Sequence, residues 1–189
     1  MDAKDPRAAA ILAFWFGSGD RDKRWFEKNP AFDEEVRRRF LALHAEAAAG
    51  NLAHWRNDPA DCLALIVLLD QFPRNMFRGT PRAFATDAMA LETAHHALAC
   101  GYDQAMRPSE RMFVYLPYEH AESLEEQQRA CELTEPLVKF PETEDVYRYA
   151  VAHCDIIQRF GRFPHRNAIL GRASTPEEIE FLMGPGSSF

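Results

Sequence analysis

The chain has little that points to nucleic acid, to a membrane or to secretion. Among its 189 residues, 29 acidic side chains outnumber 22 basic ones, which gives a net charge of −7. This balance argues against a nucleic-acid or anionic-membrane surface, because phosphate binding needs a net basic face. The longest apolar run, residues 62–69, is too short to cross a bilayer. The first residues also lack the charged-then-apolar layout of a signal peptide. These absences predict a soluble cytoplasmic protein.

Familiar catalytic and metal motifs are missing as well. The four cysteines are scattered and form no Cys-x-x-Cys pair, so they read as buried free thiols in a reducing compartment rather than a zinc site. The chain has no glycine-rich phosphate loop, no HExxH helix and no serine-centred elbow. We therefore expect no metal and no cofactor, and the sequence leaves open whether the protein is an enzyme.

Helical patterns fill the sequence, and no strand-like alternation competes with them. Capping residues before prolines, apolar positions at helical spacing and terminal glycines predict helices at about 6–16, 32–49, 59–71, 87–99, 108–116, 124–139, 143–160 and 176–182. Residues 17–20 should end the first helix, Pro117 should stop the helix that begins at 108, and Pro136 should bend or end the helix that begins at 124. Ser123 and Thr175 each match a capping box. The prediction is one all-α domain over residues 1–189, with residues 183–189 as a loose tail.

One short sequence motif occurs twice, and we call it the repeated phrase. Residues 72–75 read Phe-Pro-Arg-Asn and residues 163–167 read Phe-Pro-His-Arg-Asn. In both copies a glycine follows the asparagine by four residues, and an arginine, Arg78 or Arg172, adjoins that glycine before a Thr-Pro helix start. An arginine and an asparagine after a proline are donors held on a stiff turn. The two copies are either corners that meet in space or chance likenesses of loop chemistry.

A carboxylate ends the most apolar helix. Asp70 faces the negative end of the helix dipole, which is unfavourable unless a cation compensates, and Arg74 follows four residues later. This pair either locks the corner after the helix or contributes to a binding site.

A second polar group lies just before a predicted helix. Glu119 and Glu122 flank His120, and a histidine with an adjacent carboxylate is a suitable acid–base pair. Alternatively Glu122 caps the following helix and Glu119 pairs with an arginine. A metal site is a third reading, although the spacing matches no known metal motif. His153 lies on an apolar helical stripe, which is more typical of a hydrogen-bonded core residue.

Arginines cluster around both copies of the phrase. Positions near helix C-termini explain some of them, since cations are favoured there. The functional reading is that Arg74, Arg78, Arg162 and Arg166 converge, because forked guanidinium groups bind phosphate or carboxylate in pairs. The resulting candidate ligand-binding residues are Asp70, Arg74, Asn75, Arg78, Glu119, His120, Glu122, Arg162, His165, Arg166 and Asn167, with His120, Glu119 and His165 as candidate catalytic residues.

Several longer motifs carry a family resemblance. They are residues 14–17 (Phe-Trp-Phe-Gly), 25–26, 68–75, 84–87, 115–122 and 159–167. Together they resemble a bacterial family of uncharacterised proteins, the domain-of-unknown-function family 924, over about residues 11–182. The resemblance implies an all-helical fold grouped with tetratricopeptide-like superhelices of antiparallel helix pairs. It implies no established activity, cofactor or catalytic residue. The consensus tetratricopeptide repeat is not present, so any such fold is divergent.

Three functional hypotheses follow. The first is a binding domain that takes a small anionic ligand, phosphate or carboxylate, in a pocket lined by arginine, glutamate and histidine. The second is a metal-independent hydrolase in which His120 or His165 is the base and arginines stabilise charge. The third is a scaffold that binds a peptide segment in a helical groove. Neither nucleic acid nor membrane is an expected partner, and the oligomeric state is left open.

Overall fold

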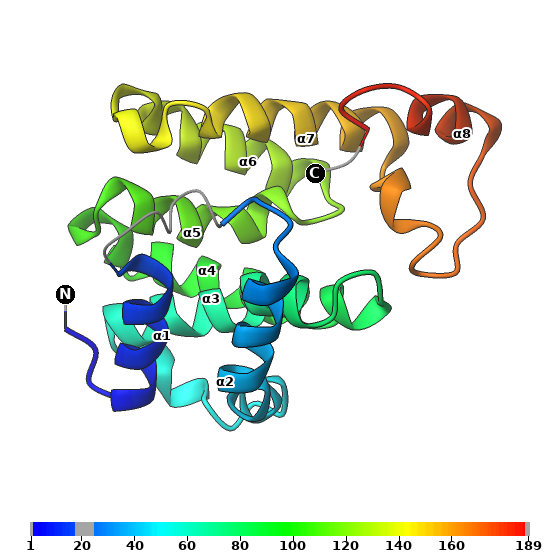
Figure 1. The fold of residues 1–189 in the computed structure, drawn as a ribbon. Helices are drawn as coiled ribbons and strands as arrows, with labels where there is room; N and C mark the ends of the chain where they lie inside the picture. The colour runs from blue at the N-terminus through cyan, green and yellow to red at the C-terminus, as the bar shows by residue number, and fades with distance from the viewer. Residues whose placement is uncertain (1, 18–24, 188–189) are drawn as a thin grey trace.

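The fold is built from helices joined by short turns. The computed structural model describes residues 2–17 and 25–187, and in these two ranges it contains no strand, which confirms the all-helical class. Figure 1 shows the arrangement. The helices are α1 (Pro6–Phe16), α2 (Pro30–Ala48), α3 (Pro59–Met76), α4 (Asp87–Ala99), α5 (Pro108–Glu119), α6 (Leu124–Thr134), α7 (Val146–Phe160) and α8 (Pro176–Leu182).

Helix α3 is the centre of the molecule. It packs against α1, α2, α4 and α5, and almost all of its side chains are buried, as its apolar composition predicts. Burial of each leucine or isoleucine side chain stabilises the folded state by about 1.5–3 kcal/mol. Helices α5, α6 and α7 continue the stack on the other side of α3 from α2 (Figure 1). A smaller apolar cluster around Ile157 and Phe163 holds the C-terminal part.

The predicted helix starts are largely confirmed. Asp5 and Asp58 each accept a backbone hydrogen bond as N-caps before a proline. At α8 the Thr175–Glu178 capping box is present with both of its hydrogen bonds. Ser123 does precede α6, but its side chain makes no capping bond, so the capping box predicted there is wrong.

Helix α3 does not end where the repeated phrase begins, and that prediction is wrong. It runs through Pro73 to Met76. A proline inside a helix removes the hydrogen bond to the carbonyl four residues earlier, which here belongs to Leu69. The Thr86 hydroxyl donates to that Leu69 carbonyl at 2.6 Å. A donor distant in sequence therefore replaces the missing amide, and the helix continues.

Pro117 does not stop a helix either. Helix α5 continues to Glu119, with Tyr115, Leu116 and Tyr118 buried around the proline. An interior proline costs about 3 kcal/mol, whereas burial of each large side chain contributes about 1.5–3 kcal/mol. Packing therefore outweighs the proline.

The remaining boundaries follow the prediction closely. Helix α6 ends before Pro136 and a short 3₁₀ helix, Glu135–Lys139, follows. Helix α7 begins at Val146 rather than at residue 143, and Gly161 ends it with a φ of 70°. The predicted break at 17–20 falls mostly outside the described residues, as does the last part of the predicted tail. Within the described ranges, no helix combines the length and apolar character needed to cross a membrane.

Candidate functional site

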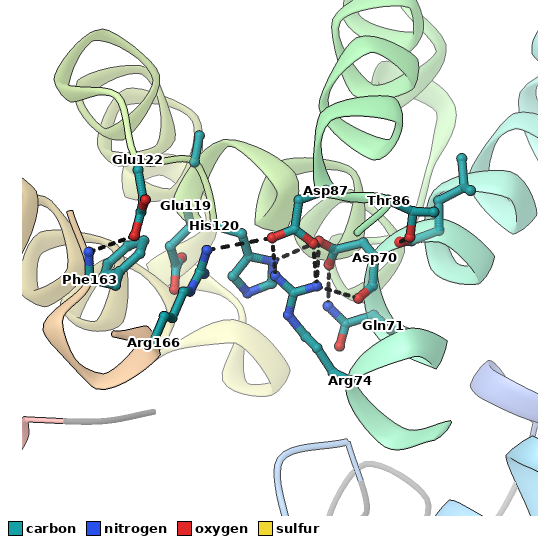
Figure 2. A network of polar contacts seen from close by, with 12 residues as sticks. Asp70, Gln71, Arg74, Thr86, Asp87, Glu119, His120, Glu122, Phe163 and Arg166 are labelled. Carbon is teal, nitrogen blue, oxygen red and sulfur yellow. Dashed lines mark hydrogen bonds and ion pairs between the residues drawn. The ribbon is translucent and has the colours of Figure 1, made fainter. Parts of the chain in front are cut away.

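The two copies of the repeated phrase meet at one carboxylate. We call residues 72–81 the first corner and residues 162–176 the second corner. Arg74 of the first corner donates two hydrogen bonds to Asp87, at 2.8 and 3.0 Å. Arg166 of the second corner lies 3.5 Å from the same carboxylate, Nη1 to Oδ2, the oxygen that also accepts from Arg74 Nη2. Figure 2 shows Asp87 between these two guanidinium groups. Arginines about ninety residues apart in sequence therefore share a partner.

Asp70 lies behind Arg74 and is fully buried. Arg74 Nη1 is 3.3 Å from its Oδ1 and donates to its backbone carbonyl at 2.6 Å. Gln71 Nε2 donates to its Oδ2. Burial would raise the pKa of the Asp70 carboxyl, yet the charge of Arg74 and the contact with His120 bring it below its usual range. Asp70 is therefore ionised, and Arg74 is the compensating cation that the helix-dipole argument requires.

His120 connects this buried acid to open space. Its Nδ1 is 2.8 Å from Asp70 Oδ1 (Figure 2). Burial first, and then the positive charge of Arg74, lower the pKa of His120 despite the opposing effect of Asp70. A neutral imidazole donates its Nδ1–H to Asp70, which leaves Nε2 as the basic nitrogen. This geometry orients a base by a buried carboxylate.

Arg166 is held mainly by aromatic rings. Its guanidinium carbon lies 4.7 Å from the Phe84 ring centroid and 4.5 Å from that of Phe163. The side chain is buried, and its Nε has no hydrogen-bond partner among the described residues. Burial and the nearby charge of Arg74 lower the pKa of Arg166 to about 10. Within residues 2–17 and 25–187 its one ion pair is the long contact with Asp87, so its charge is incompletely compensated there.

Glu119 pairs with a histidine, not with an arginine as one reading predicted. Its Oε1 is 3.0 Å from His153 Nδ1, and both side chains are buried. The second oxygen, Oε2, is buried without a hydrogen-bond partner among the described residues. His153 does point inward from α7, as its apolar stripe predicts, and its Nδ1 also lies 2.9 Å from the Tyr149 carbonyl oxygen.

The other predicted site residues bind carboxylates of their own. Asn75 and Arg78 both donate to Asp33. In the second corner, Asn167 and Arg162 both donate to Glu178. Of the four arginines predicted to converge, Arg74, Arg78 and Arg166 line one cleft, whereas Arg162 does not. Arg74 and Arg166 share Asp87, and Arg78 pairs with Asp33.

The hydrogen-bond partners of Glu122 also lie apart from Asp87. It accepts from the Phe163 amide at 2.8 Å and from Arg172 at 2.6 and 2.9 Å, so it does not cap α6. Its contacts tie the second corner to the end of α5.

A cleft of about 810 Å³ opens beside this network. Of the predicted site residues, it is lined by Arg74, Asn75, Arg78, Glu119, His120, His165 and Arg166. Asp70 lies beneath them, whereas Glu122, Arg162 and Asn167 do not line the cleft. Burial, and then the charge of Arg166, lower the pKa of His165 to about 4, so this ring is neutral at pH 7.

Sequence reasoning missed Asp87, which joins the corners. Its only local signal is an acidic residue in the first turn of α4, and the helix dipole alone accounts for that. Nothing in the sequence marks it as the partner of two distant arginines. Within residues 2–17 and 25–187, no group of three histidines, cysteines or acids is arranged to hold a metal ion.

Comparison with known proteins agrees with this all-helical architecture. The family model described as "Bacterial protein of unknown function (DUF924)" matches residues 11–186. The chain belongs to this family. A solved structure, titled as that of a protein of unknown function, ATU0120 from Agrobacterium tumefaciens, is 46% identical to this chain with a TM-score of 0.85. The match covers 93% of this chain and 96% of that one. No curated protein sequence matches significantly.

Proposed function

We propose that the cleft binds a small ligand through an anionic group placed at Arg166. The observation that carries this proposal is the incomplete pairing of Arg166, a buried cation whose single ion pair among the described residues is 3.5 Å long. A buried charge is costly unless it is paired. An anion in the cleft would supply the missing compensation.

The other arginines are less suited to this task. Arg74 already donates two hydrogen bonds to Asp87. Arg78 donates two to Asp33. A ligand would have to displace these charge-assisted bonds, which are among the stronger ones in proteins.

Arg166 is also held in place before any ligand arrives. Phe84 and Phe163 lie against its guanidinium, and such cation–π contacts contribute about 0.5–2 kcal/mol each. A preoriented group loses little conformational entropy on binding. His120 and Gln71 line the same cleft and offer further polar contacts.

Titration calorimetry with acetate and with inorganic phosphate tests this proposal. We expect at least one of them to bind the wild-type protein, and Arg166→Gln to weaken that binding at least about tenfold, the effect of losing a charge-assisted hydrogen bond. Arg162→Gln is the matched control, because Arg162 belongs to the same corner but lies outside the cleft.

Two outcomes would reject the proposal. The first is that the folded wild-type protein binds neither anion at millimolar concentration. The second is that Arg162→Gln weakens binding as much as Arg166→Gln. Arg166→Lys, which keeps the charge, separates loss of binding from loss of folding.

A second candidate is a metal-independent hydrolase, and the Asp70–His120 pair favours it. A neutral imidazole oriented by a buried carboxylate is suited to remove a proton from water. The test is a panel of p-nitrophenyl esters and phosphates. Activity that falls at least about a hundredfold in both Asp70→Asn and His120→Gln would support the assignment, whereas activity unchanged in both would exclude it.

The order in which the helices pack bears on the type of helical fold. We infer a divergent tetratricopeptide-like arrangement from the consecutive packing of α2 on α3, α3 on α4, α5 on α6 and α6 on α7. A cytoplasmic location and a peptide-binding groove remain predictions that come from the sequence.

A further inference from the structure

We infer that the ligand is a monocarboxylate with an apolar body, rather than a phosphate or a nucleotide. This inference rests on the proposed function, because it places the carboxylate at Arg166. Two independent features of the cleft support it. One is its apolar wall, and the other is the sign of the charges at its rim.

Apolar side chains line the cleft from several elements. Met112 and Leu116 come from α5, Phe26 from the segment before α2, and Tyr149 from α7. Phe26 is 68% exposed and Tyr149 is 46% exposed. Large aromatic side chains left open at a concave site are typical of surfaces that bind an apolar group. A ligand that extends from Arg166 would cover them.

The rim of the cleft carries the opposite charge from its base. Glu27, Glu142 and Glu144 line the cleft and are exposed. Asp145 also lines it and is paired with Arg148. A ligand with several negative charges would bring some of them close to these carboxylates, where like charges repel. A ligand with one negative charge at Arg166 and an uncharged body avoids this repulsion.

The size of the cleft is compatible with such a molecule. Its volume of about 810 Å³ lies within the roughly 300–1,000 Å³ of small-molecule sites. A bare acetate or phosphate ion would leave most of it to water. The structure therefore favours an elongated or aromatic carboxylate.

A series of straight-chain carboxylates tests the inference. We expect affinity measured by calorimetry to rise from acetate through butanoate and hexanoate to octanoate, by about fourfold for each added CH₂ that becomes buried. Adenosine triphosphate should bind more weakly than octanoate. A matched pair of variants locates the hydrocarbon chain of the ligand. Tyr149→Ala should weaken octanoate at least about fivefold, the order expected for lost aromatic contact area, and leave acetate unchanged. Tyr147→Ala, on the same helix but away from the cleft, should change neither.

The outcomes separate the two levels of the proposal. If acetate binds through Arg166 but affinity does not depend on chain length, this inference is wrong and the proposed function stands. Tighter binding of adenosine triphosphate than of octanoate would also overturn the inference. If no carboxylate and no phosphate binds the folded protein, both fail. Equal effects of Tyr149→Ala and Tyr147→Ala on octanoate affinity would reject the placement of the ligand's hydrocarbon chain against Tyr149.

Discussion

The first and second corners carry the same residue types on different backbones. In the first corner, proline and arginine lie inside the last turn of α3. In the second, they form a separate 3₁₀ turn, Pro164–Arg166, after α7 has ended. Yet in both corners the arginine before the asparagine faces Asp87, and the asparagine donates to an outer carboxylate shared with another arginine. In both, the following glycine has a positive φ, 75° at Gly79 and 67° at Gly171.

This likeness shows what the repeated phrase specifies. It sets the chemistry of contacts, with one arginine for the centre and one asparagine for an outer anchor, and it does not set the backbone. The two central arginines differ in how fully they are paired, and this difference bears on the proposed function. In the part of the chain that the structure describes, Arg74 contacts two carboxylates, whereas Arg166 has one long ion pair. This difference is the reason we propose that a ligand binds at the second corner.

Removing the carboxylate shared by the corners should have the largest effect. Asp87→Ala leaves Arg74 and Arg166 without their common partner, and loss of one member of a largely buried pair costs about 3 kcal/mol. Urea unfolding followed by circular dichroism measures this change. Asp155→Ala, an exposed acid on α7, should cost less than about 0.5 kcal/mol. A loss below about 1 kcal/mol for Asp87→Ala would mean that the corners are held independently.

The histidine that only the second corner contains should make stability depend on pH. The pKa of His165 is lowered from 6.5 to about 4, chiefly by burial. The unfolded chain therefore takes up a proton near pH 6.5 while the folded protein does not, so stability falls as the pH drops from about 6.5 to 4. This loss is at most about 3 kcal/mol. His165→Gln should give a shallower pH dependence in urea unfolding over this window, and an identical slope would contradict the assignment.

The two asparagines allow a direct comparison of the outer anchors. Asn167 donates to Glu178 and Ser174 and accepts from Arg172, whereas the Asn75 side chain has one bond to another described residue, Asp33. We expect Asn167→Ala to lower the free energy of unfolding by about 2 kcal/mol and Asn75→Ala by about 1 kcal/mol. Chemical denaturation of the two variants side by side checks the order. A reversed order would show that the first corner is the better anchored one.

The smallest effect concerns the device that keeps the first corner helical. Thr86→Val removes the hydroxyl that donates to the Leu69 carbonyl while keeping the shape of the side chain. The orphaned carbonyl should cost about 1 kcal/mol. Thr93→Val is the control, because the Thr93 hydroxyl bonds a carbonyl within its own helix, where a backbone amide is also in place. Equal losses in thermal unfolding would argue against the role of Thr86.

The sequence predicts the helices better than it predicts the site, and particular residues show why. Asp58 before Pro59 and Thr175 before Pro176 are local signals, and both mark real helix starts. Pro73 misleads, because its compensation comes from Thr86, which lies thirteen residues away and cannot be recognised from a local pattern.

For the site, local charge arguments identify the right residue types but not their partners. The Asp70–Arg74 pair is predictable because its members are one helical turn apart. By contrast, Arg162 and Asn167 are drawn away by Glu178, and Glu119 by His153, through packing of helices distant in sequence. Asp87 is hidden for the same reason.

The most direct test of the account is the position of a bound carboxylate. Crystals soaked in 8-bromooctanoate would show the bromine by its anomalous scattering and the carboxylate in the electron density. We predict the carboxylate within hydrogen-bond distance of Arg166 and the bromine on the side of the cleft formed by Phe26 and Tyr149. A molecule bound with its bromine at Arg166, or bound only outside the cleft, would contradict the account.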